Sequence, residues 1–328
     1  MGIYPWQESE WNTLNVQFTN DRLAHALLFH GPDGIGKQDF VRAFVARLFC
    51  QNPDNNQACG VCESCHLLAV GNHPDLRSIA CEEDKKNISV DQIRELIDYV
   101  SLMPHSSRYK VAVIDQAELM SVNAANSLLK TLEEPPKSAL IFLVTHKPER
   151  LLPTILSRCQ KITLKQPALS EANAWLSQTI ADTDRRNALL ALANGAPLKA
   201  LAYHEQNLIE QRQLQFDSLL NLTNGQIDPV STAEKWAKLD LEISLQSLMS
   251  WISDLCRLEI SQIPDIVNID IQQELKALKA KTSLKQLVEY QQYLIQCMEL
   301  SSSNVNIQLL LEDILIHWIK LFHYKEAV

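Results

Sequence analysis

The sequence predicts a parallel α/β domain over about residues 1–165, followed by an all-helical remainder. Three short, largely apolar runs alternate with helical stretches in the first half, and strand signals stop after about Lys165. Short buried runs that are separated by helices are typical of βαβ units, whose strands pair in parallel. The three predicted strands are Ala26–Phe29, Tyr109–Ile114 and Ala139–Val144.

The first predicted strand leads into a glycine-rich turn and then into a predicted helix, Gln38–Phe49. This order of strand, glycine loop and helix is the context that a phosphate-binding loop requires. Glycines let backbone N–H groups close around phosphate oxygens, and a lysine at the end of the loop would reach the outer phosphates. The candidate nucleotide-binding residues of this loop are Gly31, Gly34, Gly36 and Lys37.

Two positions that are needed for ATP hydrolysis in phosphate-loop enzymes carry side chains here that differ from those of active enzymes. The position after Lys37 needs a Ser or Thr hydroxyl to hold Mg²⁺, and Gln38 occupies it. Asp115 ends the second predicted strand and fits the acidic residue that supports Mg²⁺. Gln116 follows it, and an amide can orient a water but cannot take its proton. We therefore expect a retained loop scaffold with weak or no nucleotide binding; an active ATPase is the alternative.

Four cysteines form the pattern C-x₈-C-x₂-C-x₂-C. Four thiolates satisfy a tetrahedral Zn²⁺, and short CxxC steps let one loop supply several ligands. We expect one structural zinc ion per chain; four free thiols and an iron–sulfur cluster are the alternatives. The predicted ligands are Cys50, Cys59, Cys62 and Cys65, whereas Cys81, Cys159, Cys256 and Cys297 are expected to be ordinary buried thiols.

Net charge and hydropathy exclude several functional classes. The formal net charge is −9, and the part after residue 165 is more acidic than the part before it. A protein that grips DNA phosphates by itself usually has a basic surplus, so we expect weak or no DNA binding by the isolated chain. No apolar run is long enough to span a membrane, and Met1–Glu10 lacks a basic signal-peptide region. These features predict a cytoplasmic protein in which disulfides are rare.

The remainder of the chain is predicted to be helical throughout. Short helices are expected over Leu169–Tyr203, with a turn at Asn194–Pro197, and long amphipathic helices from about Gln206. Two apolar stripes carry this prediction, and Asn304 is expected to cap the second helix. The apolar stripes are expected either to pack within the domain or to contribute to an oligomer interface. The stripes are Leu245, Leu248, Met249, Ile252 and Leu255, and Ile307, Leu310, Leu311, Ile314, Leu315, Trp318 and Phe322.

Four segments carry a resemblance to a known family. The segment Asp115–Pro136 and the triplet Ser157-Arg158-Cys159 resemble the AAA+ clamp-loader subunits of bacterial DNA polymerase III. The opening Tyr4-Pro5-Trp6 and the run His25–Leu28 look like the delta-prime branch of that family. Its gamma/tau branch keeps an intact loop and an Asp-Glu pair, so Gln38 and Gln116 again favour the delta-prime branch. The resemblance covers about residues 4–165.

The resemblance implies a three-part plan. It consists of a RecA-like AAA+ domain at 1–165 with a zinc module at 50–65, a small helical lid at 166–207 and a helical collar for oligomerisation at 208–328. Arg158 would act as an arginine finger in the ATP site of a neighbouring subunit; an ordinary surface arginine is the alternative. Thr145 would be the phosphate-sensing polar residue, and neither Leu198 nor Lys199 is assigned the role of the lid's usual arginine.

The resemblance also implies a function. The chain would be a non-catalytic subunit of the DNA-directed DNA polymerase III holoenzyme that helps to load the sliding clamp onto primed DNA during replication. Its partners would be the gamma/tau and delta subunits, with the clamp and DNA contacted through the complex. An active gamma/tau-type ATPase and a zinc module that binds nucleic acid directly are the competing functions.

Overall fold

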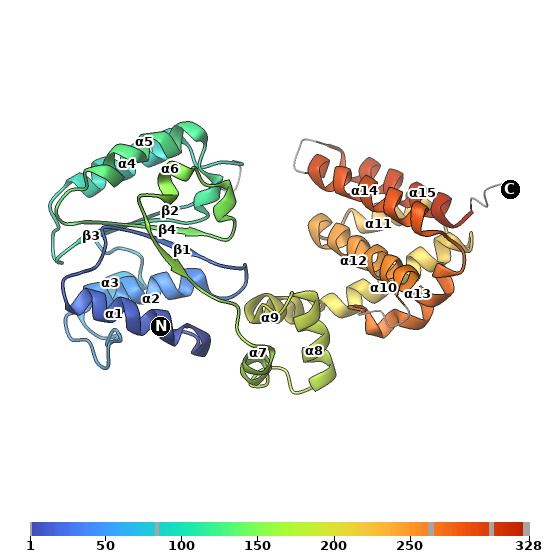
Figure 1. Ribbon diagram of the computed structural model, residues 1–328, viewed down its shortest axis with the longest axis horizontal. Coiled ribbons are helices and arrows are strands. Elements are labelled where there is room, and N and C mark those ends of the chain that lie inside the picture. Colours follow the sequence, from blue (N-terminus) through green and yellow to red (C-terminus); the bar gives the residue numbers. More distant parts are fainter. Residues whose placement is uncertain (1, 83–84, 262–265, 302–304, 324–328) are drawn as a thin grey trace. The chain divides into compact units, whose positions relative to one another are not determined.

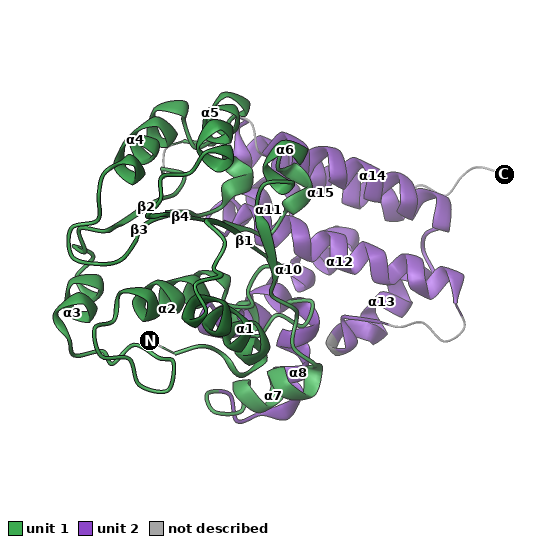
Figure 2. Ribbon diagram, turned by 60° about the vertical axis from the view of Figure 1, so that its left-hand side comes forward, with its two compact units in different colours: residues 1–179, 193–200 green, residues 180–192, 201–328 purple. Residues whose placement is uncertain are grey.

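The computed structural model describes residues 2–82, 85–261, 266–301 and 305–323, and the chain forms two compact units (Figure 1). The first unit comprises Met1–Thr179 with Ala193–Ala200, and the second comprises Ile180–Leu192 with Leu201–Val328 (Figure 2). The first is an α/β unit and the second is helical. Among the residues that the structure describes, none of the helices is long and apolar enough to cross a membrane.

The first unit is built on a five-stranded sheet in which every pair of neighbouring strands is parallel. The strand order is β2-β3-β4-β1-β5. Parallel neighbours need crossover connections, and Figure 1 shows these helices in two layers: α1, α2 and α3 on one face, α4 and α5 on the other. The predicted parallel α/β domain is thus confirmed. The strands are β1 (Ala26–His30), β2 (Leu76–Ile79), β3 (Lys110–Ile114), β4 (Ala139–Thr145) and β5 (Gln160–Thr163).

Two helices of this unit, α4 (Val90–Ser101) and α5 (Val122–Glu133), begin at a serine that caps them. The side chain of Ser89 accepts a hydrogen bond from the backbone N–H of Gln92 at the start of α4, and Ser121 does the same for Ala124 at the start of α5. The elements are η1 (Pro5–Gln7), α1 (Glu8–Thr19), α2 (Lys37–Phe49), α3 (Glu63–Ala69), α4 (Val90–Ser101), η2 (Ala117–Leu119), α5 (Val122–Glu133), η3 (Pro148–Arg150), α6 (Pro153–Leu156) and α7 (Leu169–Leu176).

The three predicted strands match β1, β3 and β4 to within one residue at each end, and the predicted helix matches α2. β2 and β5 were not predicted. They are the two edge strands, they are only four residues long, and most of their side chains are partly or fully exposed. An edge strand is covered on fewer sides than a central one, so it lacks the continuous apolar run that reveals β4.

A buried carboxylate ties the loop after α4 to the sheet. Asp75 is fully buried just before β2, and its oxygens accept hydrogen bonds from the backbone N–H groups of His105 (2.7 Å), Ser106 (2.8 Å) and Ser107 (2.9 Å). The ammonium group of Lys110 lies 3.4 Å away. Burial by itself pushes the pKa of Asp75 upward, but these donors hold it well below its ordinary range.

The second unit has a helical core of its own. Trp251 on α12 and Trp318 on α15 are fully buried at its centre. α12 contacts α13 and α14, while α15 contacts α10, α11 and α14. The helices are α8 (Thr183–Leu192), α10 (Leu208–Thr223), α11 (Pro229–Trp236), α12 (Leu241–Ile260), η4 (Ile269–Ile271), α13 (Gln272–Lys279), α14 (Leu284–Ser301) and α15 (Ile307–His323), and α9 (Pro197–Glu205) begins in the first unit and ends in the second.

Both predicted apolar stripes are largely buried within this unit. On α12 the four aliphatic residues Leu245, Leu248, Ile252 and Leu255 are buried and Met249 packs against them. On α15 the stripe is buried from Leu311 to Phe322, but Ile307 in the first turn is exposed. Packing within the unit therefore explains most of both stripes. The predicted cap, Asn304, lies outside the described residues.

The Asp75 network predicts a specific loss of stability. Asp75→Asn should cost about 3 kcal/mol of unfolding free energy at pH 7, because an amide N–H₂ would face backbone donors. Since the folded-state pKa is depressed, this stabilisation is fully present above the ordinary pKa of about 3.9 and is lost as pH falls through the folded value. The difference in unfolding free energy between the wild type and Asp75→Asn, measured by urea or thermal unfolding, should therefore be smaller in strong acid than at pH 7.

Asp98→Asn is the matched control, because Asp98 is an exposed aspartate on α4 in the same unit. It should leave the free energy of unfolding within about 0.5 kcal/mol of the wild type, both at pH 7 and in strong acid. Equal stabilities of the Asp75→Asn and Asp98→Asn variants at pH 7 would show that the network does not hold this loop.

Candidate functional site

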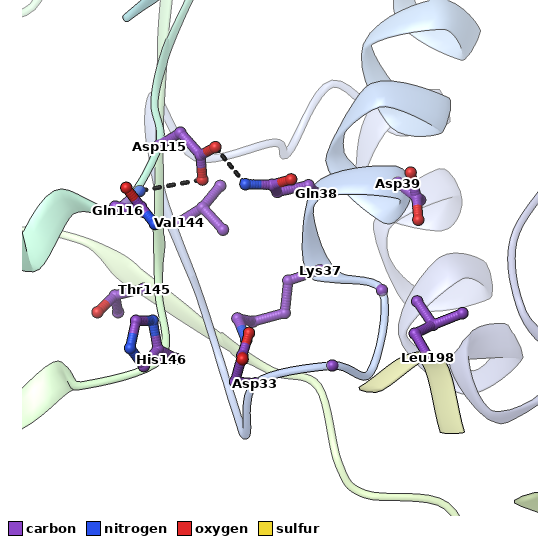
Figure 3. A pocket seen from close by; sticks show the side chains of 12 residues that line it. Asp33, Lys37, Gln38, Asp39, Asp115, Gln116, Val144, Thr145, His146 and Leu198 are labelled. Carbon is purple, nitrogen blue, oxygen red and sulfur yellow. Dashed lines mark hydrogen bonds between the residues drawn. The ribbon is translucent and has the colours of Figure 1, made fainter. Parts of the chain in front are cut away.

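The carboxyl ends of β1, β3 and β4 meet at one edge of the sheet and form a pocket. Parallel pairing sets His30 opposite Thr145, and Ile114 opposite Leu143, so the residues that follow β1 and β3 lie beside the end of β4. The pocket has a volume of about 250 Å³ (Figure 3). It is lined by Asp33, Gly34, Gly36, Lys37, Gln38, Asp39, Asp115, Gln116, Val144, Thr145, His146 and Leu198.

The glycine loop follows β1 directly at Gly31 and is packed against other parts of the first unit. Gly34 and Gly36 have φ angles of +73° and +83°, which favour glycine. A Cβ atom at Gly34 would lie 2.6 Å from the Cβ of Lys199, and one at Gly36 would lie 2.3 Å from the ring of Tyr4. The backbone N–H of Leu198 donates to the Gly34 carbonyl at 3.0 Å. The loop therefore needs both glycines for close packing, apart from any ligand.

Lys37 begins α2 and turns back onto its own loop. Its ammonium group donates to the carbonyl oxygen of Pro32 at 2.5 Å, and the residue is buried. Burial lowers the pKa of Lys37, because desolvation disfavours the charged form, and the nearby carboxylates of Asp33, Glu118 and Asp115 oppose that shift. The side chain thus binds a protein carbonyl where a phosphate-loop lysine would reach a nucleotide.

Gln38 is joined directly to the acidic residue at the end of β3. Its side-chain amide N–H₂ donates to Oδ2 of Asp115, and the backbone N–H of Gln116 donates to Oδ1 at 3.0 Å (Figure 3). Both carboxylate oxygens are therefore engaged by protein donors. Gln38 therefore presents its amide nitrogen, which is not a metal ligand, to the carboxylate that would support Mg²⁺. Burial raises the pKa of Asp115.

The charge around the pocket is unfavourable for a polyphosphate. Three carboxylates line it, those of Asp33, Asp39 and Asp115, against the single ammonium group of Lys37. The hydroxyl of Tyr4 donates to Oδ2 of Asp39 at 3.0 Å, and burial together with this bond raises the pKa of Tyr4 to about 12. Without a bound cation, the carboxylates would repel phosphate oxygens.

His146, which lines the pocket, forms a pair with Glu118 that the sequence did not reveal. Oε1 of Glu118 lies 2.6 Å from Nδ1 of His146, and the Glu118 side chain is 1% exposed. Thr145 beside it is buried, and its hydroxyl accepts a hydrogen bond from the backbone N–H of Lys147 at 3.0 Å. Glu118 and His146 are 28 residues apart, so only the pairing of β3 with β4 brings them together.

Arg158 lies two residues after α6 and two before β5, and its guanidinium group is held by three acceptors. Nη1 donates to the backbone carbonyl of Thr154 at 2.9 Å and contacts Oγ of Ser157 at 3.4 Å, while Nη2 donates to the carboxylate of Glu133. The side chain of Arg158 is 32% exposed. Cys159, the next residue, is buried and anchors the turn.

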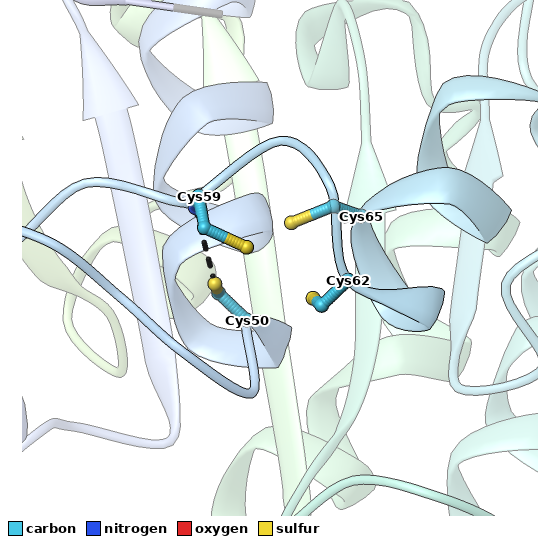
Figure 4. A group of neighbouring side chains, drawn as sticks. All are labelled: Cys50, Cys59, Cys62 and Cys65. Atoms are coloured by element: carbon cyan, nitrogen blue, oxygen red, sulfur yellow. Dashed lines mark hydrogen bonds between the residues drawn. The ribbon is translucent and has the colours of Figure 1, made fainter.

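The four predicted metal ligands converge (Figure 4). The sulfur atoms of Cys50, Cys59, Cys62 and Cys65 all lie within 4.8 Å of one another. Cys50 ends α2, Cys62 caps the start of α3 and Cys65 lies in the first turn of α3. In a tetrahedral site with bonds of about 2.3 Å, sulfur atoms would be about 3.8 Å apart, so the cluster can hold a metal ion with small adjustments.

The cluster's environment favours ionisation of Cys59 and Cys62 and opposes that of Cys50 and Cys65, as the directions of their pKa shifts show. The backbone N–H of Cys59 donates to the sulfur of Cys50 at 3.2 Å. Burial opposes ionisation of Cys62, yet hydrogen bonds from Gln51 and Cys65 lower its pKa to about 6. Burial, reinforced by Cys62, raises the pKa of Cys65 to about 12. Four neighbouring thiolates would repel one another, and a divalent cation removes that cost.

The remaining cysteines differ slightly from the prediction. Cys159, Cys256 and Cys297 are buried, as expected. Cys81 is only partly buried, and its thiol donates to the carbonyl of Lys85 at 2.9 Å. It follows β2 at the edge of the sheet, where fewer elements cover it.

Family models match both parts of the chain. One described as "DNA polymerase III, delta subunit" matches residues 6–168, and one described as "DNA polymerase III, delta subunit, C terminal" matches residues 206–320. Between them the two models leave residues 169–205 and a few residues at each end of the sequence unmatched.

Similar proteins agree with these models. DNA polymerase III subunit delta′ of Pseudomonas aeruginosa is 36% identical over 97% of this chain and 98% of that protein. The Escherichia coli subunit delta′ is 37% identical over 65% of this chain and 64% of its own length. The crystal structure of a DNA polymerase III gamma subunit-related protein from Thermotoga maritima superposes with a TM-score of 0.50, at 19% identity, over 96% of this chain and all of that one. This likeness confirms the predicted AAA+ fold.

Proposed function

The chain belongs to the DNA polymerase III subunit delta′ family, a component of the clamp loader, and on that premise we propose that it acts without hydrolysing ATP itself. The observation that carries the proposal is the bond from the Gln38 amide to Asp115, with Gln116 N–H on the other carboxylate oxygen. A Mg²⁺ ion would have to displace both donors, and Gln116 supplies no base for the attacking water. We propose weak or no nucleotide binding at this site.

The contribution of this subunit to hydrolysis would come from Arg158. It would enter the ATP site of a neighbouring gamma/tau subunit and stabilise charge that develops on the transferred phosphoryl group. Supporting this role, Arg158 lies in a surface turn outside the pocket of its own chain, and its guanidinium group is partly exposed. The complex-level activity would be that of the DNA-directed DNA polymerase III holoenzyme.

The partners would be the gamma/tau and delta subunits, with the sliding clamp and primed DNA contacted through the assembled complex. The net charge of −9 supports weak or no DNA binding by the isolated chain. We also propose the three-part division into the AAA+ domain, a lid at 166–207 and a collar at 208–328. The start of α10 at Leu208, and a family model that begins at residue 206, support the second boundary.

The cysteine cluster would hold one structural zinc ion through Cys50, Cys59, Cys62 and Cys65. Four sulfur ligands close a tetrahedral shell and leave no position for a substrate, so the ion would stabilise the fold without taking part in chemistry. It would tie the end of α2 to the start of α3. An iron–sulfur cluster uses the same ligands and is the chemical alternative.

An active gamma/tau-type ATPase is the alternative function. It would require Gln38 to leave Asp115, and it would require a loop without a hydroxyl group to hold Mg²⁺.

We expect the isolated protein to release phosphate from ATP no faster than a Lys37→Ala variant, because the metal and water positions carry amides. Phosphate release and titration with a fluorescent ATP analogue measure this. Turnover well above the Lys37→Ala rate would establish the ATPase alternative.

Elemental analysis should find about one zinc per chain and little iron. Cys62→Ser should lose the zinc and lower the melting temperature by about 5–10 °C, because metal binding is coupled to folding. Cys81→Ser, which removes a partly buried thiol outside the cluster, should keep the full zinc content. If the purified protein were brown, with visible charge-transfer absorption, the cysteines would hold an iron–sulfur cluster and the zinc assignment would be wrong.

Arg158→Ala should assemble normally but slow clamp loading and DNA-stimulated ATPase in the reconstituted complex by roughly twofold to tenfold. The loss is incomplete because other interfaces keep their own arginines. Arg158→Lys should rescue poorly, since a point charge does not reproduce the planar guanidinium fork. Gel filtration checks assembly, and loading at the wild-type rate by an assembled Ala variant would refute the role in trans.

A further inference from the structure

The acceptors around Arg158 differ in what fixes them. Thr154 and Ser157 lie within four residues of the arginine, so their bonds to it are local. Glu133 is 25 residues away in sequence and is the last residue of α5. Among these three acceptors, Glu133 is therefore the one that links the guanidinium group to a distant helix, α5.

α5 is a firm support for this carboxylate. The helix is capped by Ser121, and its inner face is buried at Ala124, Leu128 and Leu132. Glu133 also stands at the carboxyl end of the helix, where unpaired backbone carbonyls favour a nearby cation. The position of the Glu133 carboxylate is thus set by a packed helix, although the side chain itself is 49% exposed.

The pair is poorly placed to serve stability. Both side chains are partly exposed to solvent, and an ion pair of that kind contributes little to folding. It does restrict the rotamers of a long, flexible arginine side chain. A guanidinium group has five N–H donors, and at most three are used by Thr154, Ser157 and Glu133. Two remain for a ligand outside the chain.

We infer that Glu133 is a positioning residue for Arg158: it holds the guanidinium group in one orientation while leaving donors free for a phosphate group of the neighbouring subunit. The inference rests on the proposed action of Arg158 in trans. A pre-positioned finger loses less side-chain freedom when the transition state forms, so it would raise kcat with little effect on the KM for ATP.

The test is steady-state ATP hydrolysis by the reconstituted complex with the sliding clamp and primed DNA. Glu133→Ala should lower kcat about twofold, by no more than Arg158→Ala does, and leave the KM for ATP unchanged. Glu133→Gln should retain most of the rate, because its amide oxygen still accepts the hydrogen bond. Glu134→Gln is the matched control: it removes the neighbouring exposed carboxylate and should behave as the wild type. Gel filtration confirms assembly of each variant.

An Arg158→Ala background separates the two ideas. There Glu133→Ala should have no further effect, since the group that it positions is gone. A wild-type or higher kcat for Glu133→Ala, or a further loss in the Arg158→Ala background, would overturn the positioning role. If Arg158→Ala alone leaves kcat unchanged, the action in trans is itself wrong; if it lowers kcat while Glu133→Ala does not, only the positioning role fails.

Discussion

Parallel pairing of β3, β4 and β1 is the constraint on which the rest of the candidate site depends. It brings the glycine loop, Asp115 and Thr145 to one edge of the sheet, although more than a hundred residues separate the first from the last. Each strand returns to that edge through a crossover helix, so the frame is set by backbone bonds and buried aliphatic side chains. Polar residues at the edge can therefore change without loss of the fold, and in this chain Gln38 and Gln116 stand there beside Asp115.

Gln38 and Gln116 show how the polar groups at this edge are satisfied within the chain. A buried carboxylate is costly unless donors or a cation satisfy it. In this chain the Gln38 amide and the Gln116 N–H donate to the half-buried carboxylate of Asp115, and the Pro32 carbonyl accepts from the buried ammonium group of Lys37. The polar groups of the loop are thus paired with one another. The same unit carries Arg158 on a separate turn, where it contacts Glu133 on α5, so the proposed finger does not depend on what the pocket binds.

The sequence predicted those features that depend on residues close together in the chain, and it missed those that depend on contacts between distant segments. Local patterns located β1, β3, β4 and α2, and the short spacing of the cysteines predicted that their sulfur atoms would meet. The exposed edge strands β2 and β5 lack a pattern of that kind. The contacts of Tyr4 with Gly36, of Glu118 with His146 and of Glu133 with Arg158 join distant segments. No periodicity reports such contacts, and the family resemblance identified the motifs without showing which residues touch.

The central claim is that this subunit contributes to ATP hydrolysis through Arg158 and not through its own phosphate loop. The most direct measurement is single-turnover ATP hydrolysis in an assembled complex where only the ATP site next to this subunit is intact. Lys37→Ala and Arg158→Ala variants of this chain would be compared in it. The account predicts an unchanged rate for Lys37→Ala and a large loss for Arg158→Ala. The opposite pattern, with loss only for Lys37→Ala, would contradict it.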